Sequence, residues 1–192
     1  MTDENSRDGQ GRRGQILDAA RAVAKSHGYT GLNFRHLAGE VGITSASLHY
    51  HFPTKADLGE ALARQYRELA AAELAALAER EPDLSARLTA YIAIFRRALE
   101  DDNQICLASQ LGAEYDDLPE PVRRELAAFA DVNIAWLGRV LHDADQPADG
   151  IHDHAVAIFT AISGAQLVAR GTSDIALFDA TTATYRRLGL IP

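Results

Sequence analysis

The sequence predicts an all-α protein of about nine helices, in which the character of the chain changes near residue 55. Apolar residues recur every three or four positions through most of the 192 residues, as they do in amphipathic helices. Glycine and proline interrupt this pattern at spacings typical of helix ends, and no segment makes a convincing strand. A chain of this length buries a substantial core without disulfides or metals.

Composition narrows the class of protein further. Hydrophobic residues make up 47% of the chain and charged residues 24%, which is typical of a globular protein rather than of a disordered or membrane protein. No apolar run approaches the roughly 18 residues that a bilayer span needs, and the polar N-terminus has no secretory signal. The single cysteine, Cys106, excludes an internal disulfide and suits a reducing compartment, so we expect a cytoplasmic protein.

The charges are distributed unevenly along the chain. The net charge is −8, yet residues 1–55 carry seven Lys/Arg against five Asp/Glu, while residues 56–192 carry twelve against twenty-two. A cationic head on an acidic body suggests local contact with a polyanion. A chance fluctuation of a few charges gives the same balance, so charge alone decides nothing.

The first two expected helices lie before residue 42. Ile16 and Val23 recur at helical spacing, and Gly28 follows as a stop signal. Asn33 can cap a short second helix, which Gly42 ends.

The third expected helix begins after Thr44 and runs to about Phe52, with Leu48 on its inward side. Pro53 breaks it. Residues 54–57 form a capping box that opens a long fourth helix.

The remaining chain predicts further helices separated by short loops. Pro82 ends the long helix, and loops are expected at residues 115–119 and around Pro147 and Gly150. The expected helices cover about 55–80, 84–101, 104–113, 121–143, 152–171 and 174–188.

The second and third helices, joined by the glycine-containing turn 42–44, predict a helix-turn-helix unit. Its second helix must be short, apolar inward and polar outward, because it enters a DNA major groove. Residues 44–52 meet that demand: opposite Leu48 and Phe52 lie the outward residues Ser45, Ala46, His49 and Tyr50.

The run NFRHLAGEVGITSASLHYHFPTKADL, residues 33–58, resembles the TetR family of bacterial repressors without a gap. The resemblance implies a DNA-binding head and contacts to double-stranded, palindromic operator DNA. His49 stands where the family usually has a tyrosine, which makes that contact sensitive to pH. The implied DNA-binding residues are Asn33, Arg35, Thr44, Ser45, Ala46, Ser47, His49, Tyr50, His51 and Lys55.

The resemblance also implies a division of the chain into three parts. Residues 1–14 are expected to form a flexible arm, residues 15–55 the DNA-binding domain, and residues 56–192 a ligand-binding and dimerisation domain. Arg12 and Arg13 either clamp phosphate or belong to a solvated tail.

Dimerisation is a second implication of the family. Its last two long helices form a four-helix bundle with a second subunit, so we expect a homodimer that spans two half-sites. Ser163, Gly164 and Ala165 either allow close approach in that bundle or pack inside one subunit.

Cys106 lies in a segment, residues 105–119, that is similar to a TetR subgroup with cysteine on its sixth helix. That subgroup includes regulators responding to reactive electrophiles and acrylate-like compounds. Either the thiol adds to an electrophilic effector or is oxidised inside the cavity, or Cys106 is a small buried core residue. No lysine follows Lys55, so any base near the thiol is arginine, histidine or a helix end.

Other residues fall on elements that line the family's ligand cavity, although an aromatic stripe at helical spacing is more often core. They are Tyr66, Tyr91, Phe95, Gln110, Trp136 and Phe159. Arg170 can neutralise a carboxylate or form an ordinary ion pair.

No metal site, cofactor or enzymatic activity is predicted. His152 and His154 lie two positions apart, near His142, and therefore face differently on a helix. No nucleophile elbow, phosphate loop or paired-carboxylate motif appears. The competing classes are an enzyme with a Cys–His pair and a helix-turn-helix protein that acts through a protein partner.

Overall fold

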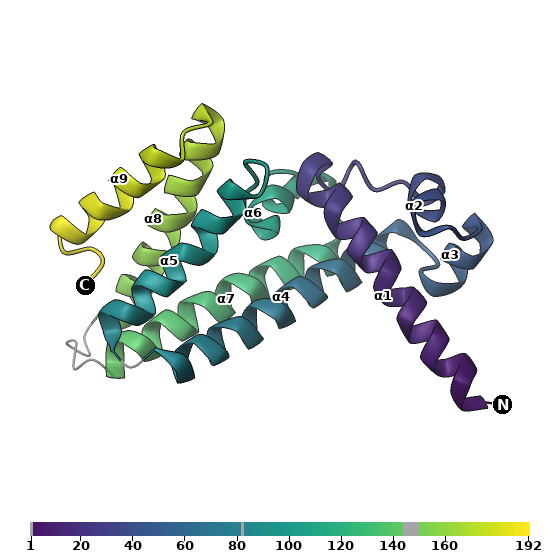
Figure 1. The fold of residues 1–192 in the computed structure, drawn as a ribbon, viewed down its shortest axis with the longest axis horizontal. Coiled ribbons are helices and arrows are strands. Elements are labelled where there is room, and N and C mark those ends of the chain that lie inside the picture. Colours follow the sequence, from purple (N-terminus) through teal and green to yellow (C-terminus); the bar gives the residue numbers. More distant parts are fainter. Residues whose placement is uncertain (1, 82, 144–149) are drawn as a thin grey trace.

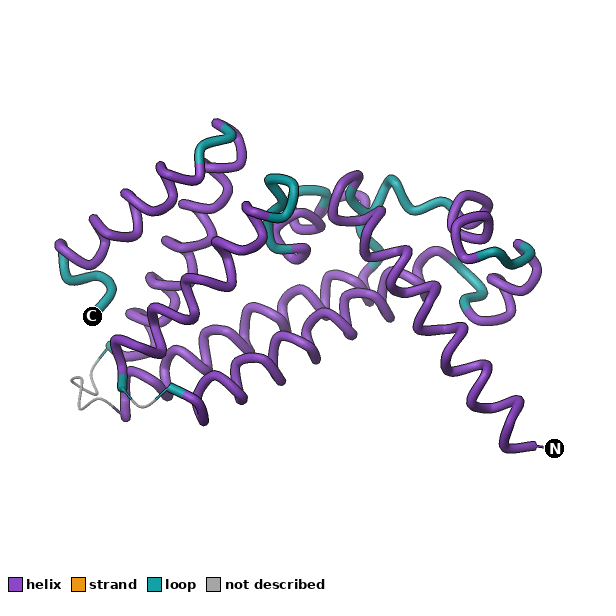
Figure 2. Tube along the Cα trace, viewed as in Figure 1, coloured by secondary structure: helices purple, strands orange, loops and turns teal. Residues whose placement is uncertain are grey.

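The computed structural model describes residues 2–81, 83–143 and 150–192. These residues form nine α-helices and one 3₁₀ turn, and Figures 1 and 2 show their arrangement. The helices are α1 (Thr2–His27), α2 (Phe34–Val41), α3 (Ser45–His51), α4 (Lys55–Arg80), α5 (Leu84–Glu100), α6 (Leu107–Gly112), α7 (Glu120–Asp143), α8 (Ile151–Thr172) and α9 (Ile175–Arg187).

The all-α prediction is confirmed, and helices α4 to α9 begin and end within three residues of their expected bounds. Residues 115–119, expected as a loop, include a 3₁₀ turn at Tyr115–Asp117. Pro82 and Pro147 lie outside the described residues.

The first helix differs most, because α1 begins at Thr2 and not near residue 16. Residues 2–14 therefore continue α1, whose N-terminal end projects away from the rest of the molecule in Figure 1. Apolar periodicity does not reveal such a stretch, since local backbone hydrogen bonds sustain a helix without core contacts. The flexibility expected of residues 1–14 stays a prediction.

Local sequence explains the sharp turns of the head, which we define as α1 to α3. Asn33 Oδ1 accepts hydrogen bonds from Arg35 N at 2.9 Å and His36 N at 3.1 Å, so it caps α2. Gly42 ends α2 with φ of +71°, a conformation that costs glycine little. Thr44 caps α3 through Ser47 N.

The head shares its core with the body, which we define as α4 to α9. Buried head residues such as Ile16, Leu37 and Leu48 belong to one apolar cluster with Leu107 of α6 and Val122 of α7. A second cluster fills the body between α4, α5, α7, α8 and α9. The two parts are therefore joined by packed apolar contacts and not by a linker alone.

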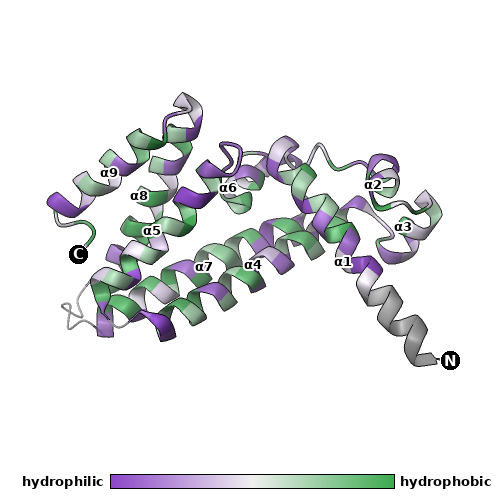
Figure 3. Ribbon diagram, viewed as in Figure 1, coloured by the Kyte–Doolittle hydropathy of each residue, from purple (hydrophilic) through white to green (hydrophobic). Residues whose placement is uncertain are grey.

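Helix α8 is the most apolar long helix of the body. Its 22 residues include an 18-residue window of mean hydropathy 1.2, so length and composition alone would allow a bilayer span. The expectation that no apolar run approaches that length was therefore too strict. Figure 3 shows the apolar colouring along α8, and its residues Ile158, Ile162 and Ala169 are fully buried in the body. One face of α8 thus packs into the body, while 33% of the window as a whole is buried.

Candidate DNA interface and effector cavity

Helix α3 presents a polar outer side on an apolar base. Leu48 is fully buried and Phe52 is 1% exposed, so both anchor α3 to the head core. On the opposite side Ser45, Ala46 and His49 are exposed, and Tyr50 is 85% exposed. Such a helix offers small residues and one projecting ring to a major groove.

Two histidines flank Tyr50 and are held by contacts within the head. His49 Nδ1 lies 3.1 Å from the carbonyl oxygen of Pro53, and its ring lies 4.7 Å from that of Phe34. His51 is half-buried, and its ring centre lies 5.4 Å from that of Tyr50 in an edge-to-face arrangement. His49 is therefore oriented by the end of its own helix.

Several other predicted DNA-binding residues have structural roles as well. The side chains of Asn33 and Thr44 act as helix caps, whereas Arg35 is exposed at the first turn of α2. The backbone N–H of Ser47 donates a hydrogen bond to the side-chain oxygen of Thr44.

Lys55, predicted to contact phosphate, contacts the turn between α1 and α2 in this structure. Its Nζ donates to the carbonyl oxygen of Thr30 at 3.1 Å and lies 4.7 Å from the centre of the Tyr29 ring. Burial lowers the pKa of Lys55, while the nearby carboxylate of Glu114 acts in the opposite direction.

Arg12 and Arg13 lie on the exposed N-terminal part of α1. The guanidinium of Arg13 sits 4.7 Å over the Phe52 ring, and Arg12 donates to Gln15. Arg13 is thus placed beside the end of α3, near the predicted reading surface.

Glu114, just after α6, links the body to the head. Its carboxylate accepts hydrogen bonds from Tyr29 N at 3.0 Å and Thr30 N at 2.8 Å, in the turn that follows α1. Gly28, with φ of +69°, allows this approach, because a Cβ there would lie 1.4 Å from Glu114 Oε1. The end of α6 therefore holds the same turn that Lys55 contacts.

A cavity of about 220 Å³ lies between α1 and the body, and Cys106 at the start of α6 borders it. Four of the predicted ligand residues line it: Tyr66, Tyr91, Phe95 and Cys106. The sequence prediction missed further lining residues from other helices, among them Arg21, Lys25, Phe129, Asn133 and Gln166.

A hydrogen bond joins the side chains of Tyr66 and Cys106 at this cavity. The Tyr66 hydroxyl donates to Cys106 Sγ at 3.4 Å and accepts from Leu107 N at 3.4 Å. Burial raises the pKa of Tyr66 well above its usual value, and the adjacent sulfur raises it further. The hydroxyl therefore stays protonated and can donate to a thiolate.

Gln166 and Asn133 are buried amides whose hydrogen bonds are made within the protein. Gln166 accepts from Cys106 N at 3.1 Å and donates to the carbonyl oxygen of Phe95 at 2.7 Å. Asn133 accepts from the Tyr91 hydroxyl at 3.0 Å. A polar residue at an otherwise apolar helical position was the signal in the sequence that could have identified both.

Three predicted ligand residues do not reach the Cys106 cavity. Gln110 and Phe159 line a second hollow of about 790 Å³ between α6, α7 and α8, together with Arg170. The indole of Trp136 is buried and stacks on Tyr91 with ring centres 5.2 Å apart. Trp136 borders a separate hollow between α4 and α7.

The described part of the chain holds no group of three or more His, Cys, Asp or Glu residues that could bind a metal ion, His142, His152 and His154 included. His154 Nε2 lies 2.7 Å from the carbonyl oxygen of Leu190, and His142 and His152 are exposed.

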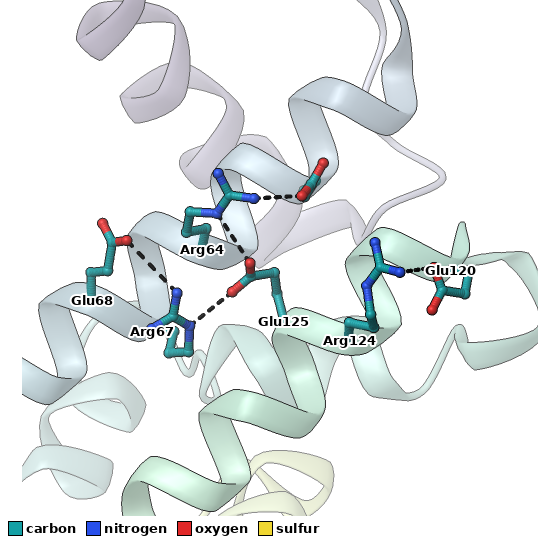
Figure 4. Close-up of polar contacts among 7 residues, drawn as sticks. Arg64, Arg67, Glu68, Glu120, Arg124 and Glu125 are labelled. Atoms are coloured by element: carbon teal, nitrogen blue, oxygen red, sulfur yellow. Dashed lines mark hydrogen bonds and ion pairs between the residues drawn. The ribbon is translucent and has the colours of Figure 1, made fainter.

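Arginine and glutamate side chains of α4 and α7 form a cluster of ion pairs, which Figure 4 shows. Glu125 of α7 accepts from Arg64 Nε at 3.1 Å and from Arg67 Nε at 2.8 Å, both on α4. Burial alone would raise the pKa of Glu125, but these two hydrogen bonds outweigh it and the pKa lies below its usual value. The cluster ties together two helices that run side by side through the body (Figure 1).

Comparison with known proteins agrees with this arrangement. Residues 16–62 match the bacterial regulatory proteins of the tetR family. The structure is similar to a TetR-family transcriptional regulator from Agrobacterium tumefaciens, with 32% identity and a TM-score of 0.85 over 93% of this chain and 98% of that one.

Two further relatives are more distant. A TetR transcriptional regulator from Legionella pneumophila shares 25% identity and a TM-score of 0.84 over 91% of this chain and 95% of that one. A nucleoid occlusion factor SlmA from Marinomonas sp. (strain MWYL1) is 26% identical over 161 residues, 80% of each chain. With the matched head and the similarity to the Agrobacterium protein over nearly its whole length, this chain belongs to the TetR family of bacterial transcriptional regulators.

Proposed function

We propose that the protein is a cytoplasmic repressor that binds a palindromic operator as a homodimer and leaves it when a small molecule occupies the Cys106 cavity. The observation that carries this proposal is the composition of the cavity wall. Arg21 and Lys25 of α1, a helix of the head, line it together with Cys106 of the body. Occupancy can therefore act on the head through direct contact.

On the DNA side, α3 is the reading helix. Ser45, Ala46, Ser47 and Tyr50 are its candidates for base edges and adjacent phosphates. The expected phosphate contacts surround them: Asn33, Arg35, Thr44, His49, His51 and Lys55. Lys55 Nζ uses one of its three N–H donors on Thr30, which leaves two for a phosphate.

A second copy of the chain is the partner that places two α3 helices on two half-sites, roughly 34 Å apart or a multiple of that spacing. Dimerisation and ligand binding are typical of the family. On α8, Gly164 is exposed and nothing lies within 4 Å of a Cβ built there, while Ala165 packs into its own subunit. Leu167 and Val168 beyond them are each 56% exposed.

The route from cavity to DNA runs through α6. This short helix packs on α1, begins directly after Cys106, and ends near Glu114, which holds the turn after α1. A ligand that moves α6 therefore changes the turn that positions Lys55. Because coupling is reciprocal, ligand and operator weaken each other by the same factor, about 5–150-fold for 1–3 kcal/mol.

For the effector, we propose an α,β-unsaturated electrophile that adds to Cys106. The thiolate forms a C–S bond to the β-carbon while the C=C π bond breaks, and the proton lost by the thiol is returned to the α-carbon. No further reactant is needed. The Tyr66 hydroxyl supports this step because its hydrogen bond stabilises the negative sulfur.

The test uses methyl acrylate and an operator identified by selection from genomic fragments. Wild type is expected to release the operator and to gain one adduct per chain by mass spectrometry. Cys106→Ser is expected to bind the operator normally but to show neither release nor adduct. Tyr66→Phe should react more slowly. Unchanged release in Cys106→Ser rules out covalent sensing.

The cavity itself is tested separately from the cysteine. Ala70 lines the cavity, and Ala70→Phe should fill it. This variant is expected to bind the operator but to respond to no inducer. If it still responds like wild type, the effector acts elsewhere and the proposal fails.

A further inference from the structure

Two cations from the head line the Cys106 cavity. Arg21 and Lys25 are four residues apart on α1, so they lie on one face of that helix, and both line the cavity. Around them the body is strongly acidic in composition. Two cations in the wall of a largely apolar cavity therefore need an explanation.

Their partners within the protein satisfy them only in part. Arg21 Nη2 lies 3.4 Å from Asp18, whose side chain is 69% exposed, and Lys25 Nζ lies 3.6 Å from Asp101, which is 70% exposed. Ion pairs this exposed contribute about 0–1 kcal/mol each. Arg21 Nη2 also donates to Gln65, but Arg21 Nε is buried without a hydrogen-bond partner among the described residues.

Of the described residues that line the cavity, one is acidic, and this is Glu73. Its carboxylate accepts from Arg97 Nη2 at 2.7 Å, so its charge is balanced from α5. Among the lining residues, two cations therefore stand against one carboxylate, and both cations belong to the head.

The interior of the cavity is mainly apolar and small. Leu74, Ile94, Phe95 and Phe129 contribute to its wall, while the amides of Asn133 and Gln166 make their hydrogen bonds within the protein. An apolar cavity of about 150 Å³ holds one benzene ring. The volume of about 220 Å³ therefore suits one ring or a short acyl chain with a polar end.

We propose that the cavity also takes small amphipathic carboxylates as non-covalent effectors, with the apolar part inside the cavity and the carboxylate on Arg21 and Lys25. This inference rests on the proposed function and names the ligand class of the same site. The carboxylate satisfies Arg21 Nε and joins α1 to the body with charge-assisted hydrogen bonds. The ligand thus acts on the first helix of the head without an intermediary.

The test measures binding of 3-phenylpropanoate and 3-phenylpropanamide by titration calorimetry on the full chain. The two compounds share ring and chain and differ in charge. Wild type is expected to bind the carboxylate at least about tenfold more tightly, as charge-assisted hydrogen bonds imply. The double variant Arg21→Gln/Lys25→Gln is expected to lose this preference while still binding the amide, which also shows that it is folded.

Two further variants sharpen the experiment. Arg80→Gln/Arg124→Gln removes the same charge from exposed residues that do not line the cavity, and should keep the preference. Glu73→Gln removes the acidic lining group and should strengthen carboxylate binding.

The outcomes separate this inference from the proposed function. Equal affinity for acid and amide, an unchanged preference in Arg21→Gln/Lys25→Gln, or no binding of either compound to wild type overturns the carboxylate site. The repressor proposal survives those results as long as Ala70→Phe abolishes induction. If Ala70→Phe remains fully inducible, the proposed function fails as well.

Discussion

Tyr50 is the most exposed large hydrophobic residue in the described part of the chain, at 85%. It contributes little to the core, so its size points to a contact outside the molecule. We expect Tyr50→Ala to weaken specific operator binding by about 1–2 kcal/mol, roughly 5–30-fold, and to change the preference at one or two base pairs. Fluorescence anisotropy with a set of single-base operator variants measures both effects.

Tyr50→Phe is the matched control, because it keeps the ring and removes only the hydroxyl. Thermal unfolding of both variants should match wild type. A Tyr50→Ala protein with unaltered operator affinity and base preference would show that the exposed ring does not touch DNA.

Glu114 joins body to head through two backbone N–H groups, those of Tyr29 and Thr30. Glu114→Gln keeps the shape but replaces one acceptor oxygen by an NH₂ group, which faces a donor. We expect a loss of about 1 kcal/mol of unfolding free energy and a weaker effect of inducer on DNA affinity. Denaturant unfolding and operator binding with and without inducer measure the two quantities.

The control for Glu114 is Glu120→Gln, which removes the same charge from an exposed pair with Arg124. That change should leave stability within about 0.5 kcal/mol of wild type. Equal inducer response in Glu114→Gln and wild type contradicts a role for this contact in coupling.

At the scale of elements, α4 and α7 are held together by apolar packing and by Glu125 between Arg64 and Arg67 (Figure 4). The folded pKa of Glu125 lies below its usual value of 4.5, so folding favours the charged form. Its contribution is therefore complete above pH 4.5 and is lost as the pH falls through the folded pKa. We expect Glu125→Gln to cost about 1–2 kcal/mol near neutral pH and nothing at low pH.

Unfolding free energies of wild type and Glu125→Gln, measured from pH 7 downward, should thus converge in acid. Glu68→Gln is the control, since Glu68 is exposed and lies 3.7 Å from Arg67. A difference between wild type and Glu125→Gln that stays constant down to the acid limit excludes the ionic contribution.

At the scale of the whole molecule, a dimer is needed for two reading helices to engage one palindrome. We expect sedimentation without DNA to give twice the 20.8 kDa of one chain at micromolar concentration. Leu167→Glu places a charge on the exposed face of α8 and should shift the protein towards monomer. Tyr50→Ala, an equally exposed change on the head, should remain dimeric. A wild type of 20.8 kDa under these conditions refutes the dimer.

The elements of the candidate site differ in how far the sequence revealed them. Residues 33–58 carry caps, turn glycine and inward apolar residues in a short contiguous stretch, so the reading helix was predictable. Cys106, Tyr66, Tyr91 and Phe95 were predicted for the cavity, and the structure brings them together there. The sequence did not identify Arg21 and Lys25 as cavity residues, because we interpreted them as part of a basic DNA-binding head.

Apart from the N-terminal extension of α1, the sequence by itself determined the order and approximate length of the helices and the caps of α2 to α4, since these depend on residues within a few positions of one another. Only the tertiary structure decided which faces meet at the cavity. It placed Gln110 and Phe159 in a different hollow, turned Trp136 onto Tyr91, and brought α1 against Cys106. The physical reason is that such neighbours are set by the crossing of packed helices, and an amphipathic pattern shows that a face is buried without showing what lies against it.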